Sequence, residues 1–231
     1  PENIYTVAVM PCIAKKFEAQ REEMTVKGIT DVDAVLTTRE LARLIRLYGI
    51  DIMNIESELA DTLLGTRSSS GKLYAVSGGV AEAVARTTYN LFSESDMINF
   101  KIQELRVQNK NRKEYKLKVA DKEINFVAVS DMINAEKLIS EIKSGKSDFQ
   151  FVEVMACPGG CVNGGGQPIP ARKEDIKARI KCIYDVDDKE SIKFAHKNPQ
   201  LNEIYKCFQD NEEENNLQKL HTAFNEREVL L

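Results

Sequence analysis

The stretch VEVMACPGGCVNGGGQP, Val152–Pro168, places two cysteines in a glycine-rich context and decides how the rest of the chain is interpreted. Cys157 and Cys161 are separated by Pro158, Gly159 and Gly160, and five of the chain's twelve glycines fall within this stretch. Because proline and glycine discourage a regular helix, we expect both thiols to lie on a tight loop. Such a loop can direct two sulfurs at one point, and its backbone N–H groups can surround an anion.

This loop has the chemistry that an iron–sulfur cluster needs, namely thiolate ligands and N–H donors to the cluster's sulfides. The spacing of Cys157 and Cys161 alone is also compatible with two other interpretations, a disulfide within the loop or two unrelated thiols. A strand expected over residues 149–155 would deliver Cys157 at its carboxyl end. Met155, the last residue of that strand, is by default an ordinary core residue.

A further cysteine follows the first predicted strand of the chain. The apolar, β-branched run at residues 4–10 predicts a buried parallel strand that ends before Pro11. Cys12 therefore stands at the carboxyl end of that strand, where open α/β sheets place their ligands. Residues 12–23 predict a helix on which Cys12, Lys15 and Glu18 share one face. Their spacing alone predicts that Lys15 and Glu18 lie on a solvated helix face.

The other elements predict an α/β fold with mostly parallel strands, flanking helices and both cysteine motifs at strand carboxyl ends. Further strands are expected at residues 33–36, 73–76, 98–105, 115–119 and 124–129, the last two forming a hairpin, and helices at residues 37–48, after 77–79, and at 134–143. The first of these helices opens on a capping box, Thr37 to Glu40, and its stripe of Leu41, Leu44, Ile45 and Tyr48 predicts a core face.

After residue 168 the sequence becomes charged and helical, so we expect two units, residues 1–168 and a helical extension at residues 169–231. Within the extension, a helix is expected over residues 172–185, and Asn198 followed by Pro199 predicts the start of another.

Isolated cysteines and histidines in the extension carry no predicted chemistry. Cys182 and Cys207 are expected to be buried apolar thiols. His196 and His221 are separated from each other and from the cysteine motifs, so capping or core roles outweigh metal ligation.

The overall composition excludes several classes of function. A net charge of −4 over 231 residues gives no basic footprint for nucleic acid, and no apolar run is long enough to span a membrane. Five cysteines scattered along the chain argue against a disulfide framework and favour a reducing, cytoplasmic location. The chain opens on Pro1 close to its first predicted strand, and we expect it to be a fragment of a longer protein.

Three segments together resemble the iron-only (di-iron) hydrogenases. The Val152–Pro168 stretch resembles their third cysteine motif, and VMPCIAKKFE at Val9–Glu18 resembles their Met-Pro-Cys-x-x-Lys-x-x-Glu motif. The segment YAVSGGVAEA at Tyr74–Ala83 is similar to the family's pocket-lining Phe-Gly-x-Thr-Gly-Gly-Val-x-Glu-Ala. Here Tyr74, Ala75 and Ala81 depart from the pattern, and we expect them to make the pocket wall more polar and slightly reshaped.

The resemblance implies a 4Fe-4S cluster bound by Cys12, Cys157 and Cys161, with Cys161 bridging to a di-iron subsite. It implies that Lys15 donates to a cyanide ligand of that subsite and that Glu18 is a nearby polar partner. Further residues implied to line the site or pack on the cofactor are Met10, Tyr74, Gly78, Gly79, Val80, Met155, Pro158, Gly159 and Gly160. The family's fourth cysteine ligand belongs to an upstream motif that this chain lacks.

The full-length parent is thereby expected to combine protons and electrons reversibly into H2, with the N-terminal remainder and a ferredoxin-type electron carrier as partners. We expect the isolated chain to be inactive and, as purified, metal-free. Two alternatives stay open: a sensory or regulatory hydrogenase homologue, and an iron–sulfur assembly factor without a di-iron subsite. Met10, Lys15 and the Pro-Gly-Gly form of the third motif favour the hydrogenases over the assembly factors.

Overall fold

The computed structural model of the chain describes residues 3–58, 61, 66–108, 110–169, 172–210 and 222–226, without the side chains of residues 207–210. His221 lies outside the described residues, as does the side chain of Cys207. No helix in the described part of the chain is long and apolar enough to cross a membrane.

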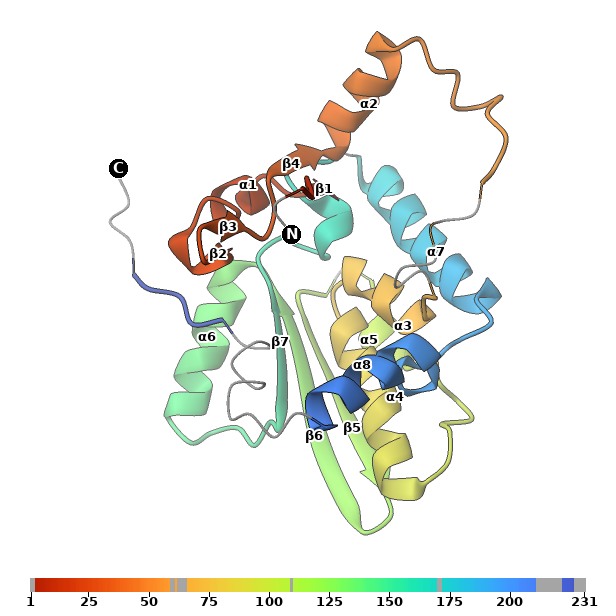
Figure 1. Ribbon diagram of the computed structural model, residues 1–231. Helices are drawn as coiled ribbons and strands as arrows, with labels where there is room; N and C mark the ends of the chain where they lie inside the picture. The colour runs from red at the N-terminus through yellow and green to blue at the C-terminus, as the bar shows by residue number, and fades with distance from the viewer. Residues whose placement is uncertain are drawn as a thin grey trace.

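The N-terminal part is a small sheet with short helices, drawn in red and orange (Figure 1). Its elements in chain order are β1 (Val7–Met10), α1 (Ala14–Glu18), η1 (Glu22–Met24), β2 (Thr25–Val26), β3 (Ile29–Thr30), β4 (Ala34–Thr37) and α2 (Thr38–Leu47). Strands β1 and β4 pair in parallel, with Met10 opposite Thr37, while β2 and β3 form a two-residue antiparallel ladder.

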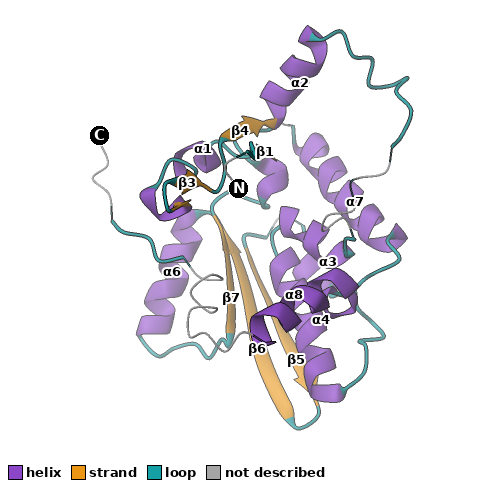
Figure 2. Cartoon of the chain, viewed as in Figure 1, coloured by secondary structure: helices purple, strands orange, loops and turns teal. Residues whose placement is uncertain are grey.

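The central part is a three-stranded sheet with helices on both faces (Figure 2). Its elements are α3 (Ser69–Lys72), η2 (Leu73–Ala75), α4 (Gly79–Ser93), α5 (Gln103–Arg106), β5 (Arg112–Val119), β6 (Lys122–Ser130), α6 (Met132–Lys143) and β7 (Phe151–Met155). The strand order is β5-β6-β7. Strands β5 and β6 form the expected antiparallel hairpin, and β7 returns through α6 to pair with β6 in parallel.

The C-terminal elements lie against the central part. They are η3 (Cys161–Asn163), α7 (Lys173–Lys189), η4 (Ala195–Lys197) and α8 (Pro199–Asp210). Helix α7 packs on α3, η2 and η3, and its Ile180 is buried with Val76 and Val162.

Strand β6 shows why the sheet has a layer on each face. Successive side chains of a strand point to opposite faces, and four buried residues of β6 divide accordingly. Phe126 and Ala128 join Ala81 of α4 in one core cluster. Val127 and Val129 join Leu138 of α6 in another. The expected α/β architecture is therefore confirmed, with parallel strand pairs leading into both cysteine motifs.

Two predicted strands are wrong. Residues 73–75 form the 3-10 helix η2 with Val76 as its C-cap, and Leu73 is buried beneath Gly79 of α4. Residues 98–105 form a loop and α5: Ile98 is exposed, whereas Ile102 and Leu105 are buried at helical spacing. The helix predicted over residues 12–23 is also shorter, since α1 ends at Glu18.

The predicted burial of β1 and α2 is wrong as well. The capping box at Thr37 and Glu40 forms as expected, but α2 has no buried residue, and Tyr48 just beyond it is 76% exposed. Val7 and Val9 on β1 are nearly half exposed. Within the described residues the two-stranded β1–β4 sheet is covered less completely than the central sheet, so apolar side chains that the sequence marks as core lie on the surface.

A buried network of four charges joins α7 to the central part. Asp187 accepts from Arg86 at 2.9 Å and from Arg106 at 2.5 Å, and Arg86 also donates to Glu82 at 2.6 Å. Asp187, Arg86 and Glu82 are at most 1% exposed. Burial opposes ionisation of Asp187, but hydrogen bonds from Arg86 and Ser69 outweigh it and lower its pKa to about 2. The network satisfies its charges internally, which is the condition for burying them.

Replacing Asp187 by asparagine tests this network, with Asp185→Asn on the exposed Lys181–Asp185 pair of the same helix as the matched control. Removing one partner of a buried pair costs roughly 3–5 kcal/mol of unfolding free energy, and removing an exposed pair costs under about 1 kcal/mol. Urea unfolding followed by circular dichroism measures both. Equal losses in the two variants would contradict the assigned role.

The depressed pKa also predicts an acid dependence. Because the pKa of Asp187 falls from 3.8 in the unfolded chain to about 2 when folded, its contribution is complete above pH 4 and is lost as the pH falls toward 2. Asp187→Asn should therefore flatten the stability profile between about pH 4 and pH 2, as measured by urea unfolding at each pH.

Candidate iron–sulfur site

The loop Cys157–Cys161, hereafter the cysteine loop, follows directly after β7. The Gly160 N–H donates to the Cys157 carbonyl at 3.0 Å, which closes a tight turn. Gly159 and Gly160 adopt φ of +79° and +100°, values that favour glycine because other residues clash there. Both cysteines are free thiols. The expected tight loop is confirmed, and it contains no disulfide.

A second glycine cluster brings the other cysteine motif beside this loop. The Gly166 N–H donates to the Pro11 carbonyl at 3.1 Å. A Cβ on Gly164 would lie 2.0 Å from the Pro11 carbonyl oxygen, and one on Gly166 would lie 2.7 Å from the Cys12 nitrogen. Only glycine permits so close an approach of two backbones. The segment after the cysteine loop therefore rests on Pro11–Cys12, the carboxyl end of β1.

The three motif cysteines are electrostatic neighbours. Burial raises the pKa of the Cys161 thiol, and nearby Cys157 and Cys12 raise it further, whereas Lys15 lowers it. Two thiols and the Lys15 cation on α1 are therefore within electrostatic range of Cys161. A cavity of about 230 Å³ opens beside Cys161 and is also lined by Pro11 and Ala75.

This donor set fits a multi-iron cluster. Within the described ranges, no three Cys, His, Asp or Glu side chains lie close enough to hold one metal ion. In a 4Fe-4S cluster each thiolate binds a different iron, so the sulfurs need not converge on one point. Soft thiolates match such a cluster in chemistry, and the thiolates supplied here number three. The N–H groups of Gly160, Gly164 and Gly166 donate to the carbonyls of Cys157, Cys161 and Pro11, so these glycines shape the loop instead of offering the expected donors to the cluster's sulfides.

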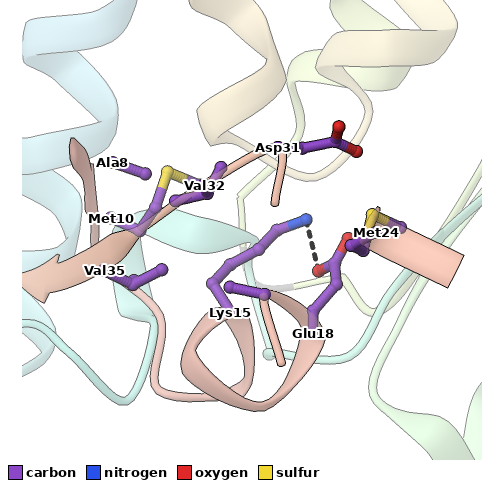
Figure 3. A pocket seen from close by; sticks show the side chains of 9 residues that line it. Ala8, Met10, Lys15, Glu18, Met24, Asp31, Val32 and Val35 are labelled. Carbon is purple, nitrogen blue, oxygen red and sulfur yellow. Dashed lines mark ion pairs between the residues drawn. The ribbon is translucent and has the colours of Figure 1, made fainter. Parts of the chain in front are cut away.

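Lys15, Glu18 and Met10 line one pocket of about 210 Å³ between β1, α1, η1 and β4. Figure 3 shows Lys15 and Glu18 pointing toward each other across this pocket, with Nζ and Oε2 2.5 Å apart. The pocket wall is otherwise mainly apolar, with Val32, Val35 and Met24 facing inward. The structure brings these three predicted site residues together, with the lysine held by the glutamate rather than free in solvent.

The predicted pocket residues on α4 serve a different contact. Gly78 and Gly79 are buried against the backbone of Leu105 and Leu73, with no room for a Cβ. The N–H groups of Gly78 and Ala81 donate to the carboxylate of Glu153 at 2.6 and 2.8 Å. This helix N-terminus is therefore occupied by a side chain of β7.

The remaining predicted site residues are spread along these segments. Val80 is partly buried in the first turn of α4, Tyr74 is 50% exposed on η2, and Pro158 is exposed at the loop apex. Met155 is half-buried at the end of β7. Ala81 is fully buried in the core, so its departure from the family pattern alters core packing and leaves the pocket wall unchanged.

The prediction that Cys182 is a buried thiol is wrong. This residue is exposed and lines the same cavity as Cys161. Ile176, Ile180 and Ile183 supply the inward stripe of α7. Residue 182 lies about 200° around the helix from Ile180, and its side chain therefore points outward. His196 behaves as expected, because its ring nitrogens lie 3.3 Å from Thr87 Oγ1 and 3.0 Å from Asp96.

Comparison with known proteins identifies the family. The family described as "Iron only hydrogenase large subunit, C-terminal domain" matches residues 1–165, and "Iron hydrogenase small subunit" matches residues 173–227. The chain belongs to the iron-only hydrogenase family. It is 37% identical, over 99% of its length, to a subunit of an NADP-reducing hydrogenase from Solidesulfovibrio fructosivorans, and covers 39% of that protein.

A structural relative and a functionally different relative also match. The fold resembles an FeFe-hydrogenase from Chlamydomonas reinhardtii with a TM-score of 0.71 at 28% identity, covering 89% of this chain and 59% of that one. A cytosolic Fe–S cluster assembly factor from Danio rerio is 28% identical over 97% of this chain, which covers 56% of it. The chain thus spans less than two thirds of each of these relatives.

Substituting the two loop glycines tests the packing of the cysteine loop. A Cβ on Gly160 would lie 2.5 Å from the Ser77 nitrogen, whereas a Cβ on Gly159 would meet nothing within 4 Å. Both positions carry left-handed strain, but only Gly160→Ala adds a backbone clash. Gly159→Ala should cost about 1 kcal/mol of unfolding free energy and Gly160→Ala more than about 2 kcal/mol.

Urea unfolding of both variants gives the comparison. A Gly160→Ala variant as stable as Gly159→Ala would show that the loop does not rest on Ser77.

Proposed function

We propose that this chain is the C-terminal part of an iron-only hydrogenase whose complete protein reversibly combines two protons and two electrons into H2. The observation that carries the proposal is the backbone contact that sets Pro11–Cys12 against Gly164–Gly166, just after Cys161. It brings Cys12 within electrostatic range of Cys161, although Cys12 and Cys157 lie about 145 residues apart in sequence. Cysteines with separate structural roles would not require backbone contacts as close as those that Gly164 and Gly166 make with Pro11–Cys12.

Different residues of the chain would bind different parts of the cofactor. Cys12, Cys157 and Cys161 would hold a 4Fe-4S cluster, with Cys161 shared with a di-iron subsite, and that group supplies the redox chemistry and the H2 binding. Lys15 is a compact cation suited to an anionic ligand such as cyanide. Glu18 orients the lysine through their ion pair. Met10 and the apolar wall of the pocket would exclude water around it.

The N-terminal remainder of the same protein is the proposed partner. Ile4, Tyr5, Val7 and Val9 at the β1 end of the chain are all 46% exposed or more, a concentration of apolar surface typical of an interaction site. The missing fourth thiolate would come from that remainder. A ferredoxin-type electron carrier and a cytoplasmic location stay predictions.

The second candidate is an iron–sulfur assembly factor, which the relative from Danio rerio supports. Lys15 and Met10 favour the hydrogenase, because an assembly factor without a di-iron subsite has no anionic ligand for a lysine to meet. A sensory hydrogenase homologue is the third. Of the departures that suggested it, Ala75 lines the cavity beside Cys161, whereas Tyr74 is half exposed and Ala81 is buried in the core. Infrared bands of CO and cyanide in the matured full-length protein would support a hydrogenase; their absence would favour the assembly factor.

Anaerobic reconstitution with iron and sulfide tests the cysteine assignment in this chain. We expect a chain purified without metal to take up a cluster, and Cys12→Ser, Cys157→Ser and Cys161→Ser each to lower bound iron about tenfold or more, as loss of a ligand does. Cys182→Ser is the matched control, because Cys182 lines the same cavity without matching a family ligand. Iron and sulfide assays with electron paramagnetic resonance give the readout. Retention of the cluster in Cys12→Ser would contradict the assignment.

The isolated chain should evolve no H2 even after reconstitution, because a cubane with three thiolates lacks one ligand and half of its surroundings. Gas chromatography of H2 with a chemical reductant and mediator measures this. Sustained H2 evolution above a protein-free control would contradict the expectation.

A further inference from the structure

Glu153 is a buried carboxylate in the middle of an otherwise apolar strand. It lies on β7, four residues before Cys157, and is 5% exposed. Its two oxygens accept from the N–H groups of Gly78 and Ala81 at the start of α4. Burying a charge is costly unless it is fully hydrogen-bonded, so this carboxylate is held by a specific set of donors.

Lys113 holds the same turn from another strand. Its ammonium group, on β5, donates to the carbonyls of Ser77 and Leu105 at 2.5 and 2.9 Å. Lys113 is 8% exposed, and it attracts Glu153 electrostatically. The Ser77–Gly78 turn is therefore bound on its N–H side by Glu153 and on its carbonyl side by Lys113.

That turn is the surface on which the cysteine loop rests. The Ser77 N–H donates to the Gly159 carbonyl at 3.1 Å. Gly160 packs so closely that a Cβ there would lie 2.5 Å from the Ser77 nitrogen. Strand β7 thus contacts this turn through Glu153, and the cysteine loop that follows β7 contacts the same turn again. The contacts form a closed ring through Glu153, Gly78, Ser77 and Gly159.

We propose that Glu153, assisted by Lys113, is a positioning residue that fixes the Ser77–Gly78 turn and thereby presets the cysteine loop for its cluster. This inference rests on the proposed function. A helix cap alone does not need a carboxylate, because a hydroxyl or amide side chain serves as well. The carboxylate of Glu153 accepts hydrogen bonds from the N–H groups of Gly78 and Ala81. The ammonium group of Lys113 donates to the Ser77 carbonyl on the other side of the turn. These opposed contacts resist movement of the turn toward either residue.

The test uses the 231-residue chain reconstituted anaerobically with iron and sulfide. Glu153→Gln keeps the size but places an amide NH2 against one N–H donor, and Lys113→Met removes the contact from β5. Glu153→Asp keeps the charge and should retain part of the effect. Leu138→Ala is the stability control, because it removes buried packing on the α6 face of the sheet, away from the loop.

The readouts are the rate of cluster loss to a ferrous-iron chelator and the electron paramagnetic resonance spectrum of the reduced cluster. Glu153→Gln should lose its cluster about tenfold faster with an altered spectrum, as loss of an outer-shell partner does, and Lys113→Met should shift both readouts in the same direction. Leu138→Ala should keep the wild-type spectrum and a lifetime within about twofold. Urea unfolding of the metal-free variants measures the free energy of unfolding of each, so that cluster loss is compared between variants of known stability.

Wild-type lifetimes and spectra in both Glu153→Gln and Lys113→Met would overturn the positioning role and leave cluster binding intact. A Leu138→Ala chain that loses its cluster as fast as Glu153→Gln would also overturn it, because stability alone would then explain the loss. A wild-type chain that takes up no cluster would overturn the proposed function as well.

Discussion

The close contact between the Gly164–Gly166 segment and Pro11–Cys12 is the constraint on which the site depends. At both outer glycines a Cβ would overlap backbone atoms of the β1 end. Two segments far apart in sequence are thereby held at backbone contact distance, and Cys12 enters the electrostatic environment of Cys161. Strands β1 and β7 belong to separate sheets, so this contact is what sets their cysteine-bearing ends side by side.

The two sheets that meet here differ in how completely they are covered. The central sheet is packed on both faces by α4 and α6, and the four-charge network fixes α7 against α4 and α5. The β1–β4 sheet carries Cys12, Lys15 and Glu18, yet it leaves apolar side chains exposed. The half of the site that stands on the central sheet is thus fully supported within the described residues. The other half presents a surface suited to a partner, which agrees with a chain that spans part of its relatives.

The sequence predicted what local chemistry determines. The position of both cysteine motifs after strands, the Thr37 capping box and the Asn198 start of α8 follow from neighbouring residues, and all three form. Long-range contacts were out of reach: nothing near Glu153 in sequence indicates that its partners are Gly78 and Ala81. The only local signal was a charged residue at a strand position whose neighbours, Val152 and Val154, are apolar.

The wrong expectations share a physical cause. An apolar stripe marks a face that needs covering, but it cannot say whether this chain supplies the cover, as Leu44 and Tyr48 show. The run at residues 73–76 has strand composition, yet packing beneath Gly79 selects a 3-10 turn. Cys182 was assigned by residue type, whereas its helix face is set by Ile180 and Ile183. Tertiary context overrode propensity in each case.

Iron-edge anomalous diffraction from crystals of the anaerobically reconstituted chain would locate the irons relative to the three sulfurs. We expect a multi-iron peak bounded by the sulfurs of Cys12, Cys157 and Cys161. An iron centre that leaves the Cys12 sulfur unligated, or one bound elsewhere on the chain, would contradict this expectation.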